Sequence, residues 1–289
     1  MNKCLKLKNL LHSDSVTYAL EAHNGASALI VEEAGFEVIW GSGLTMSASL
    51  AHRDCNELSW TQICEQFEYM ANATTIPILV DGDTGFGNFN NARMLVKKLC
   101  KYGIAGVCIE DKIFPKTNSF LSHNQLLAPI DEFVGKIAAA KDSQTNPDFC
   151  VVARTEAFIA GQGLQMALDR AYAYKEAGAD AILVHSKKST IEEIESFCKH
   201  WDHSIPLVIV PTKYAGTPPE VYIRLGISLV IWANHLFRAS LSAMRQAAAA
   251  IYKEQSVARA EKEMATVEDI FKLVNEEELR LAEGRYLPK

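Results

Sequence analysis

The sequence of 289 residues has no excess of positive charge and no long apolar run. Lysine and arginine total 29 against 35 aspartates and glutamates, which gives a formal net charge of −6 at pH 7. A chain of this charge lacks the basic balance that favours nucleic acid or anionic lipid, so we expect a small-molecule ligand and no nucleic-acid partner. No segment approaches the roughly 20 consecutive apolar residues that a membrane helix needs, so we expect no membrane partner.

The cysteines show no pairing pattern. There are seven of them, an odd number, and no C-x-x-C pair occurs. Scattered cysteines of this kind are typical of reduced, mostly buried thiols. The first 15 residues interleave lysines with leucines and have no continuous apolar core, so they are not a secretory signal. Together these features predict a cytoplasmic protein.

No low-complexity segment and no Pro- or Ser-rich linker divides the chain. Its length allows two average domains, but barrels of alternating strands and helices commonly use this length for one. Hydrophobic residues make up 48% and charged residues 22%, which is ordinary for a globular chain with a sizeable core. We therefore expect residues 1–289 to form a single domain.

A repeated phrase runs through the sequence, in which an amphipathic segment ends at a glycine and a short β-branched run follows. It occurs at Gly35, Gly103, Gly178 and Gly226. A glycine at this place suits the left-handed backbone just beyond a helix C-terminus. The phrase therefore predicts four helix-to-strand junctions.

Eight apolar runs are predicted to be strands, and segments with helical spacing lie between them. The runs cover residues 17–23, 37–42, 77–83, 106–111, 150–156, 181–186, 206–212 and 229–234. Near-continuous apolar strands that alternate with helices predict an α/β fold, a closed parallel (β/α)8 TIM barrel with the helices outside. An open doubly wound sheet is the alternative, but it usually has fewer strands and a glycine-rich first turn.

The C-terminal part of the chain exceeds what eight strand-helix units require. An Ala-rich helix is expected over residues 240–253, and a helical extension over about 255–289. An apolar stripe on this extension could pack on its own barrel or on a neighbouring subunit, and the residues alone leave both open. The stripe consists of Ile270, Phe271, Leu273, Val274, Leu279 and Leu281.

Seven of the eight apolar runs end in chemically active side chains. These are Glu21 and His23, Ser42, Asp81 and Asp83, Glu110 and Asp111, Arg154 and Glu156, His185 and Ser186, and Asn234 and His235. In a (β/α)8 barrel the C-terminal strand ends meet at one mouth, where reactive groups collect. Contact with water would explain polar residues there, but not arginine, histidine and carboxylates at one end only. The pattern favours an active site at the mouth.

Three carboxylates in this set predict a metal site. Asp81 and Asp83 are two residues apart and point the same way, and Glu110 ends the next strand. Carboxylates gathered in a mouth repel one another unless a cation lies among them. Oxygen ligands without cysteine or histidine favour Mg²⁺ or Mn²⁺, and we take Mg²⁺ as the expected cofactor.

Three further features suit an anionic ligand, and each has a structural alternative. The small residues WGSGLTMSAS at 40–49 expose backbone N–H groups and Ser42, or form an ordinary tight turn. Arg154 offers a forked cation for carboxylate or phosphoryl oxygens, or pairs with Glu156 inside the barrel. His185 donates a hydrogen bond to a ligand, or only caps its strand.

Six motifs in fixed order resemble the phosphoenolpyruvate mutase family, within the isocitrate lyase and phosphoenolpyruvate mutase superfamily. They read WGSGLTMSASLAHRDCNE, VDGDTGFGN, EDKIFPKTNSF, VVARTEA, GADAILVHSKK and VIVPTKY. The resemblance extends from about Leu10 to the terminal YLPK. It implies a barrel whose C-terminal helix is exchanged between the subunits of a homodimer or homotetramer. It also implies a Mg²⁺-dependent interconversion of phosphoenolpyruvate and phosphonopyruvate.

The resemblance further implies which residues hold the metal and the substrate carboxylate. Asp81 matches the direct metal ligand, whereas Asp83 and Glu110 match carboxylates that hold the metal through water. Trp40 matches a wall beside the carboxylate cradle. The cradle itself consists of Ser42, Gly43 and Leu44.

The phosphoryl group has its own implied partners. Arg154, His185 and Asn118 match the groups that hold the phosphoryl as it moves between oxygen and carbon. Asp54, in the motif HRDCNE, matches an aspartate that either accepts the phosphoryl or orients groups near the metal. Both roles of Asp54 stay open at this point.

We expect the residues after Glu110 to form a lid segment, at about 112–128. Phosphoryl transfer within one molecule requires positioning and charge neutralisation, and a dry site, because water would divert the phosphoryl to phosphate. A closing lid meets this requirement. In the predicted lid segment, Pro115 stiffens a stretch that brings Lys116, Asn118 and Ser119 over the substrate.

Two related groups of enzymes with other activities are alternatives to the mutase interpretation. Isocitrate and methylisocitrate lyases carry a lid cysteine in a K-[KR]-C-G-H motif, and this chain reads KIFPKTNS there, so carbon–carbon lyase activity is not expected. Phosphonopyruvate hydrolase shares most of the scaffold but resembles FPK-x-T-S at residues 114–119. Asn118 in that stretch favours the mutase.

A barrel retained as a non-catalytic metabolite-binding protein is an alternative of another class. It predicts the loss of one or more of the functional side chains. All of the diagnostic residues are present, namely Asp54, Asp81, Glu110, Arg154 and Asn118.

Overall fold

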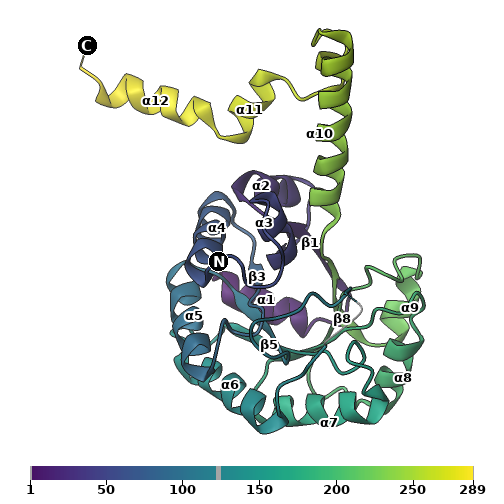
Figure 1. The fold of residues 1–289 in the computed structure, drawn as a ribbon. Helices are drawn as coiled ribbons and strands as arrows, with labels where there is room; N and C mark the ends of the chain where they lie inside the picture. Colours follow the sequence, from purple (N-terminus) through teal and green to yellow (C-terminus); the bar gives the residue numbers. More distant parts are fainter. Residues whose placement is uncertain (1, 122–124, 289) are drawn as a thin grey trace. The chain divides into compact units, whose positions relative to one another are not determined.

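A computed structural model describes residues 2–121 and 125–288 of the chain. Eight parallel strands within these residues form a closed barrel in which each strand pairs with its neighbours in sequence and β8 closes on β1 (Figure 1). The strands are β1 (Thr17–Ala22), β2 (Val38–Gly41), β3 (Ile78–Asp81), β4 (Gly106–Glu110), β5 (Cys150–Thr155), β6 (Ala181–Val184), β7 (Leu207–Ile209) and β8 (Ile227–Trp232). The prediction of a (β/α)8 barrel is confirmed, and the open doubly wound sheet is wrong.

The helices between the strands form a ring outside the barrel (Figure 1). They are α2 (Gly25–Glu33), α3 (Gly43–Ser49), α4 (Trp60–Ala73), α5 (Phe89–Lys101), α6 (Ile130–Ser143), α7 (Gly163–Glu176), α8 (Glu192–His200) and α9 (Pro219–Arg224). Strands covered by helices on one side and packed side chains on the other are buried throughout, as in β2 to β7. This double burial is why the strands read as continuous apolar runs.

The four predicted junction glycines all adopt left-handed backbone. Their φ angles are +89° at Gly35, +72° at Gly103, +95° at Gly178 and +65° at Gly226. Each follows the end of a helix and precedes a strand, so the repeated phrase in the sequence marks the helix-to-strand joints as expected.

The first helix is α1 (Lys3–Leu11), whose Leu7 side chain lies beside Gly106 at the start of β4. Its Cys4, Leu7 and Leu11 are buried, and the Cys4 thiol lies 3.6 Å from the carbonyl oxygen of Ile104. All seven cysteines are free thiols, and most are buried. In the described part of the chain, no helix combines the length and apolar character needed to cross a membrane.

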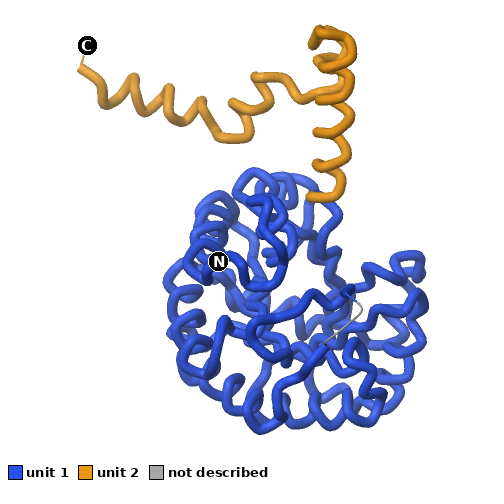
Figure 2. Tube along the Cα trace, in the orientation of Figure 1, with its two compact units in different colours: residues 1–236 blue, residues 237–289 orange. Residues whose placement is uncertain are grey.

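The chain divides into two compact units, residues 1–236 and 237–289 (Figure 2). The helix α10 (His235–Glu254) begins before the predicted Ala-rich helix, and the division falls near its start. The second unit continues with a 3-10 helix (Ala260–Glu263), α11 (Val267–Leu273) and α12 (Glu276–Tyr286). A single domain over residues 1–289, with an extension from about residue 255, stays a prediction.

We predict that the close approach of α1, β4 and β5 makes Gly106 irreplaceable. A Cβ added there would lie 2.8 Å from the carbonyl oxygen of Cys150 and 3.0 Å from Cδ2 of Leu7. Gly106→Ala should therefore lower the free energy of unfolding by about 1–3 kcal/mol, as overpacking of a core does. Urea unfolding followed by circular dichroism measures this change.

The matched control is Gly135→Ala in α6, where an added Cβ meets no atom within 4 Å. This variant should be more stable than wild type by about 0.5–1 kcal/mol, because alanine loses less backbone entropy in a helix than glycine. Equal effects of the two substitutions would contradict the close packing at Gly106.

Candidate active site

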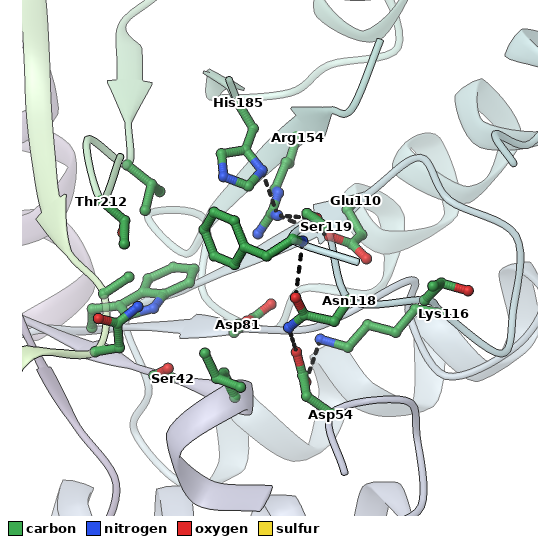
Figure 3. A pocket seen from close by; sticks show the side chains of 17 residues that line it. Ser42, Asp54, Asp81, Glu110, Lys116, Asn118, Ser119, Arg154, His185 and Thr212 are labelled. Carbon is green, nitrogen blue, oxygen red and sulfur yellow. Dashed lines mark hydrogen bonds and ion pairs between the residues drawn. The ribbon is translucent and has the colours of Figure 1, made fainter. Parts of the chain in front are cut away.

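One pocket lies at the C-terminal ends of the strands, with about 520 Å³ of space free of protein atoms (Figure 3). Because this space includes solvent at the open mouth, the lining residues rather than the volume indicate the kind of ligand. Residues from the ends of the strands, from the loop after α3 and from the lid segment line the pocket. They are Trp40, Ser42, Leu44, Asp54, Asp81, Glu110, Lys116, Thr117, Asn118, Ser119, Phe120, Arg154, His185, Val210, Thr212, Ala233 and Asn234.

All residues predicted for the site line this pocket except Gly43 and Asp83. These two lie against its carboxylates. A Cβ added to Gly43 would lie 3.1 Å from Oδ1 of Asp83 and 3.2 Å from Oδ2 of Asp81. The backbone of Gly43 therefore sits directly beside the two aspartates, where only glycine leaves their carboxylates undisturbed.

The predicted carboxylate cradle is the junction between β2 and α3. Ser42 caps α3, and its hydroxyl accepts a hydrogen bond from the Thr45 amide at 3.4 Å. The first N–H groups of a helix have no acceptor within the helix, which suits an anion. Ser42 and Leu44 face the pocket, and Trp40, 2% exposed, forms part of its wall.

Asp54 anchors the lid segment. Its Oδ1 lies 2.7 Å from Nζ of Lys116, and its Oδ2 accepts a hydrogen bond from Nδ2 of Asn118 at 2.7 Å (Figure 3). Burial alone would raise the pKa of Asp54, but Lys116 and the hydrogen bonds from the lid hold it below its ordinary value. Asp54 is thus a carboxylate whose two oxygens are both bound by lid side chains.

Lys116 also pairs with Asp83, so it joins two aspartates from different loops. Burial raises the pKa of Asp83 to about 8 despite Lys116, and repulsion from Asp81 and Asp54 adds to this rise. Burial lowers the pKa of Lys116, but the surrounding carboxylates outweigh it and raise the pKa well above the ordinary value. The surroundings of Lys116 are therefore rich in negative charge.

Asn56 is a functional neighbour that the sequence reasoning missed. Its Nδ2 donates to Oδ2 of Asp83 at 2.8 Å, and its Oδ1 accepts from the backbone N–H of Lys116 at 2.8 Å. Its backbone is left-handed, with φ +60°, a conformation that asparagine tolerates better than most residues. Asn56 is the asparagine of the motif HRDCNE, but its place in the sequence did not show which residues it would contact.

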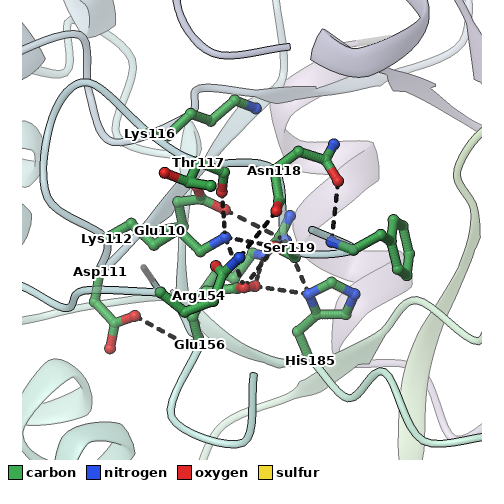
Figure 4. A network of polar contacts seen from close by, with 12 residues as sticks. Glu110, Asp111, Lys112, Lys116, Thr117, Asn118, Ser119, Arg154, Glu156 and His185 are labelled. Atoms are coloured by element: carbon green, nitrogen blue, oxygen red, sulfur yellow. Dashed lines mark hydrogen bonds and ion pairs between the residues drawn. The ribbon is translucent and has the colours of Figure 1, made fainter. Parts of the chain in front are cut away.

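A second cluster surrounds Glu156, directly after β5 (Figure 4). Arg154 Nε lies 2.5 Å and His185 Nδ1 2.7 Å from Oε1 of Glu156. Ser119 Oγ donates to Oε2 at 2.6 Å, and Nζ of Lys112 lies 3.3 Å from the same oxygen. Burial would raise the pKa of Glu156, but these positive neighbours hold it well below its ordinary value. Arg154 was expected either to bind an anionic ligand or to pair with Glu156. The pair with Glu156 is present, and Arg154 also lines the pocket.

His185 presents its second ring nitrogen without a protein partner. Among the described residues, its buried Nε2 has no hydrogen-bond partner, whereas Nδ1 also lies 2.9 Å from Nη2 of Arg154. Burial lowers the pKa of His185, against the opposing effect of Glu156. The ring edge that faces away from Glu156 is therefore available for a ligand.

Hydrogen bonds hold the lid segment both at its base and over the pocket. Lys112 and Leu127 form an antiparallel bridge, and the Ile113 amide donates to the Leu126 carbonyl at 3.2 Å. Nζ of Lys112 donates to the Thr117 carbonyl at 2.7 Å. Residues 122–124 of the predicted lid segment lie outside the described residues.

The predicted metal residues fit a magnesium ion that keeps water ligands. Asp81 and Glu110 both line the pocket, and the buried Oε1 of Glu110 has no hydrogen-bond partner among the described residues. No group of three or more His, Cys, Asp or Glu side chains in residues 2–121 and 125–288 is close enough to hold a metal ion alone. Mg²⁺ usually binds through one or two carboxylates, and water and substrate complete its shell, which this arrangement permits.

The sequence reasoning also left six lining residues out of the site. They are Thr117, Phe120, Val210, Thr212, Ala233 and Asn234. Thr212 follows β7, the one predicted strand for which no active end residue was named, and its buried hydroxyl has no hydrogen-bond partner among the described residues. Phe120 packs edge-on against His185, with 5.9 Å between ring centroids. The polar residue after the seventh run was a usable signal for Thr212, whereas Phe120 required the folded lid.

Comparison with known proteins relates this chain to a family. Residues 7–252 match the family model described as phosphoenolpyruvate phosphomutase. The chain is 54% identical over 286 residues to phosphoenolpyruvate phosphomutase of Tetrahymena pyriformis, and the match covers 99% of this chain and 95% of the relative.

Solved structures agree over the whole chain. A crystal structure of phosphoenolpyruvate phosphomutase from Streptomyces platensis subsp. rosaceus superposes with a TM-score of 0.96 at 39% identity, and covers 99% of both chains. Phosphonopyruvate hydrolase in complex with oxalate and Mg²⁺ superposes with a TM-score of 0.94 at 40% identity, and covers 100% of both chains. This fold therefore occurs in proteins named for two reactions.

We predict that a negative charge at residue 118 opens the lid. In Asn118→Asp a carboxylate would lie where Nδ2 now lies 2.7 Å from Oδ2 of Asp54, so attraction becomes repulsion. Amide hydrogen exchange of residues 113–121, measured by mass spectrometry, should accelerate about tenfold or more, which corresponds to about 1.4 kcal/mol of lost lid stability.

The control is Asn90→Asp, the same charge change at an exposed residue in the first turn of α5. It should leave exchange in the lid unchanged. If Asn118→Asp also left it unchanged, the contact between Asn118 and Asp54 would not hold the lid.

Proposed function

The chain belongs to the phosphoenolpyruvate phosphomutase family, and from that premise we propose that it interconverts phosphoenolpyruvate and phosphonopyruvate. The observation that carries this proposal is the closed lid, in which Lys116 and Asn118 bind Asp54 over the pocket. In the reaction, the bond between phosphorus and the enol oxygen breaks and a bond between phosphorus and carbon forms. No water or proton is consumed, so a pocket that excludes water suits it.

Each part of the pocket has a task in this proposal. Ser42, Gly43 and Leu44 hold the substrate carboxylate beside Trp40. Arg154 and His185, with Asn118 from the lid, hold the phosphoryl group during its transfer, a step that depends on positioning and electrostatic stabilisation more than on covalent help from the protein.

Asp54 acts in this proposal as an orienting residue. A phosphoryl acceptor needs a free oxygen, and both oxygens of Asp54 are bound by the lid. This arrangement supports the orienting role over the acceptor role. Asp54 then fixes Lys116 and Asn118 in place above the substrate.

We propose Mg²⁺ as the cofactor, with Asp81 as its direct ligand and Asp83 and Glu110 as ligands through water. Two features support this assignment: Oε1 of Glu110 has no hydrogen-bond partner within the described part of the chain, and all the donors are oxygens. When bound, Mg²⁺ would supply positive charge for the oxygens of the substrate. The solved hydrolase structure with Mg²⁺ and oxalate is consistent with a metal in this fold.

A homo-oligomer with exchanged C-terminal helices also belongs to the proposal. The apolar side chains in and beside α11 and α12 support it, because Ile270, Val274, Leu279 and Leu281 are each at least half exposed in the single chain. These apolar side chains could be buried against another subunit in either a dimer or a tetramer. The cytoplasmic location stays a prediction.

Phosphorus NMR of the purified protein with phosphonopyruvate and Mg²⁺ tests the function. We expect the phosphonate signal to be replaced by that of phosphoenolpyruvate. Inorganic phosphate with pyruvate would instead identify a hydrolase, the second candidate, which the structural match to phosphonopyruvate hydrolase favours. No turnover with or without metal would identify a non-catalytic binding protein.

We predict that Asp54→Ala and Asn118→Ala each lower kcat by about 10²-fold or more, the usual cost of losing a group that stabilises a transition state. The fold should be intact by circular dichroism. Asp14→Ala and Asn90→Ala are matched controls at exposed residues and should be as active as wild type. Near-normal rates in either test variant would remove that residue from the mechanism.

We predict that Gly43→Ala weakens metal binding about tenfold, as changes beside metal ligands commonly do. The added Cβ would displace the carboxylates of Asp81 and Asp83. Electron paramagnetic resonance of Mn²⁺ titrated into the protein measures this affinity without turnover. Gly216→Ala, where an added Cβ meets no atom within 4 Å, is the control. Unchanged affinity in Gly43→Ala would place the metal elsewhere.

A further inference from the structure

We propose that Glu156 is a positioning residue that couples closure of the lid to the alignment of Arg154 and His185. The inference rests on the proposed function, because these two side chains hold the phosphoryl group there. Glu156 is fully buried and does not line the pocket, so it acts only through its neighbours.

The two carboxylate oxygens of Glu156 have separate partners (Figure 4). Oε1 lies 2.5 Å from Nε of Arg154 and 2.7 Å from Nδ1 of His185, the two groups at the phosphoryl site. Oε2 binds the lid instead, through Oγ of Ser119 at 2.6 Å and Nζ of Lys112 at 3.3 Å. One carboxylate therefore connects the lid to the groups that hold the substrate.

Ser119 makes this connection sensitive to lid position. Its hydroxyl has one hydrogen, which it donates to Glu156, and it accepts from Nζ of Lys112 at 2.7 Å and from Nη2 of Arg154 at 3.2 Å. The hydroxyl is fully used only when the lid is closed. When the lid leaves, Glu156 loses a donor and Arg154 loses an acceptor at the same time.

The backbone of Glu156 is fixed independently of the lid. Its amide donates to Oδ1 of Asp111 at 2.8 Å, and Oδ2 of Asp111 accepts from the Tyr174 hydroxyl at 2.7 Å and from Arg170 at 3.2 Å. The carboxylate thus extends from a rigid strand end towards a movable segment. Lid closure changes its partners and leaves its position unchanged.

The consequence is that Arg154 and His185 are correctly held only while the lid excludes water. An amide cannot replace the carboxylate, because its single oxygen can serve only one side. The amide nitrogen of glutamine would then face either Arg154 and His185 or Lys112 and Ser119, and the pair that faces it would lose its carboxylate acceptor. A poorly held phosphoryl group under a loosened lid is open to attack by water.

The experiment compares Glu156→Gln, Ser119→Ala and the double variant by phosphorus NMR with phosphonopyruvate and Mg²⁺. We expect Glu156→Gln to lower turnover at least tenfold and to raise the share of product that appears as phosphate and pyruvate several-fold. Ser119→Ala should shift the product ratio in the same direction, and Ser119→Thr, which keeps the hydroxyl, should restore it. The double variant should match Glu156→Gln within about twofold, because both changes break one connection.

Asp180→Asn is the matched control. It removes a carboxylate that binds Lys141 at 2.7 Å and the Val151 amide at 2.7 Å, next to the start of β6 and outside the pocket. It should lower the unfolding temperature and leave the product ratio unchanged. If Glu156→Gln behaved like this control, or if the losses of the two single variants multiplied in the double variant, the coupling role would be wrong.

A second readout separates this inference from the proposed function. Trypsin cleavage after Lys116, in Mg²⁺ and oxalate, reports lid closure without turnover. Wild type should be protected, whereas Glu156→Gln should be cut several-fold faster. If wild type forms no phosphoenolpyruvate, the proposed function fails and this assay still tests the coupling. Equal protection of both proteins would overturn the coupling itself.

Discussion

The site depends on charge balance at a buried barrel mouth. Five carboxylates gather there, Asp54, Asp81, Asp83, Glu110 and Glu156, and the lid segment and β5 supply three cations, Lys112, Lys116 and Arg154. Buried charges are stable only when they are paired, so an excess of two negative charges, with all five carboxylates ionised, supports the proposed divalent cation. Burial is the main cause that raises the pKa of Asp83 to about 8, and repulsion from Asp81 and Asp54 adds to the rise. Lid, metal and substrate are therefore parts of one electrostatic arrangement.

The barrel makes this arrangement possible because it holds the charges on rigid strand ends. Strands buried throughout fix the positions of Asp81, Glu110 and Arg154 through the core that surrounds them. The lid segment is the proposed movable part, and the bridge between Lys112 and Leu127 closes its base. In this account the carboxylates on the strand ends bind the metal. The lid segment, which carries Lys116, encloses the substrate.

The sequence predicted the barrel well because each of its signals is local. Continuous apolar runs and the junction glycines depend on a few neighbouring residues, and all eight strands and all four left-handed glycines are confirmed. Contacts between distant segments were harder. Asn56 binds Asp83 across 27 residues and Lys116 across 60, and Glu156 binds Ser119 across 37, so only the fold reveals their partners. Thr212 was missed although its place after the seventh run was a visible signal.

The central claim is that phosphorus moves within one molecule in a pocket closed to water by the lid. The most direct measurement is turnover of phosphonopyruvate with Mg²⁺ in water enriched in oxygen-18, followed by mass spectrometry of the products. The account predicts phosphoenolpyruvate whose three terminal phosphoryl oxygens carry no oxygen-18, and no labelled phosphate, because no water attacks the phosphorus. Formation of oxygen-18 phosphate with pyruvate as the main product would contradict it.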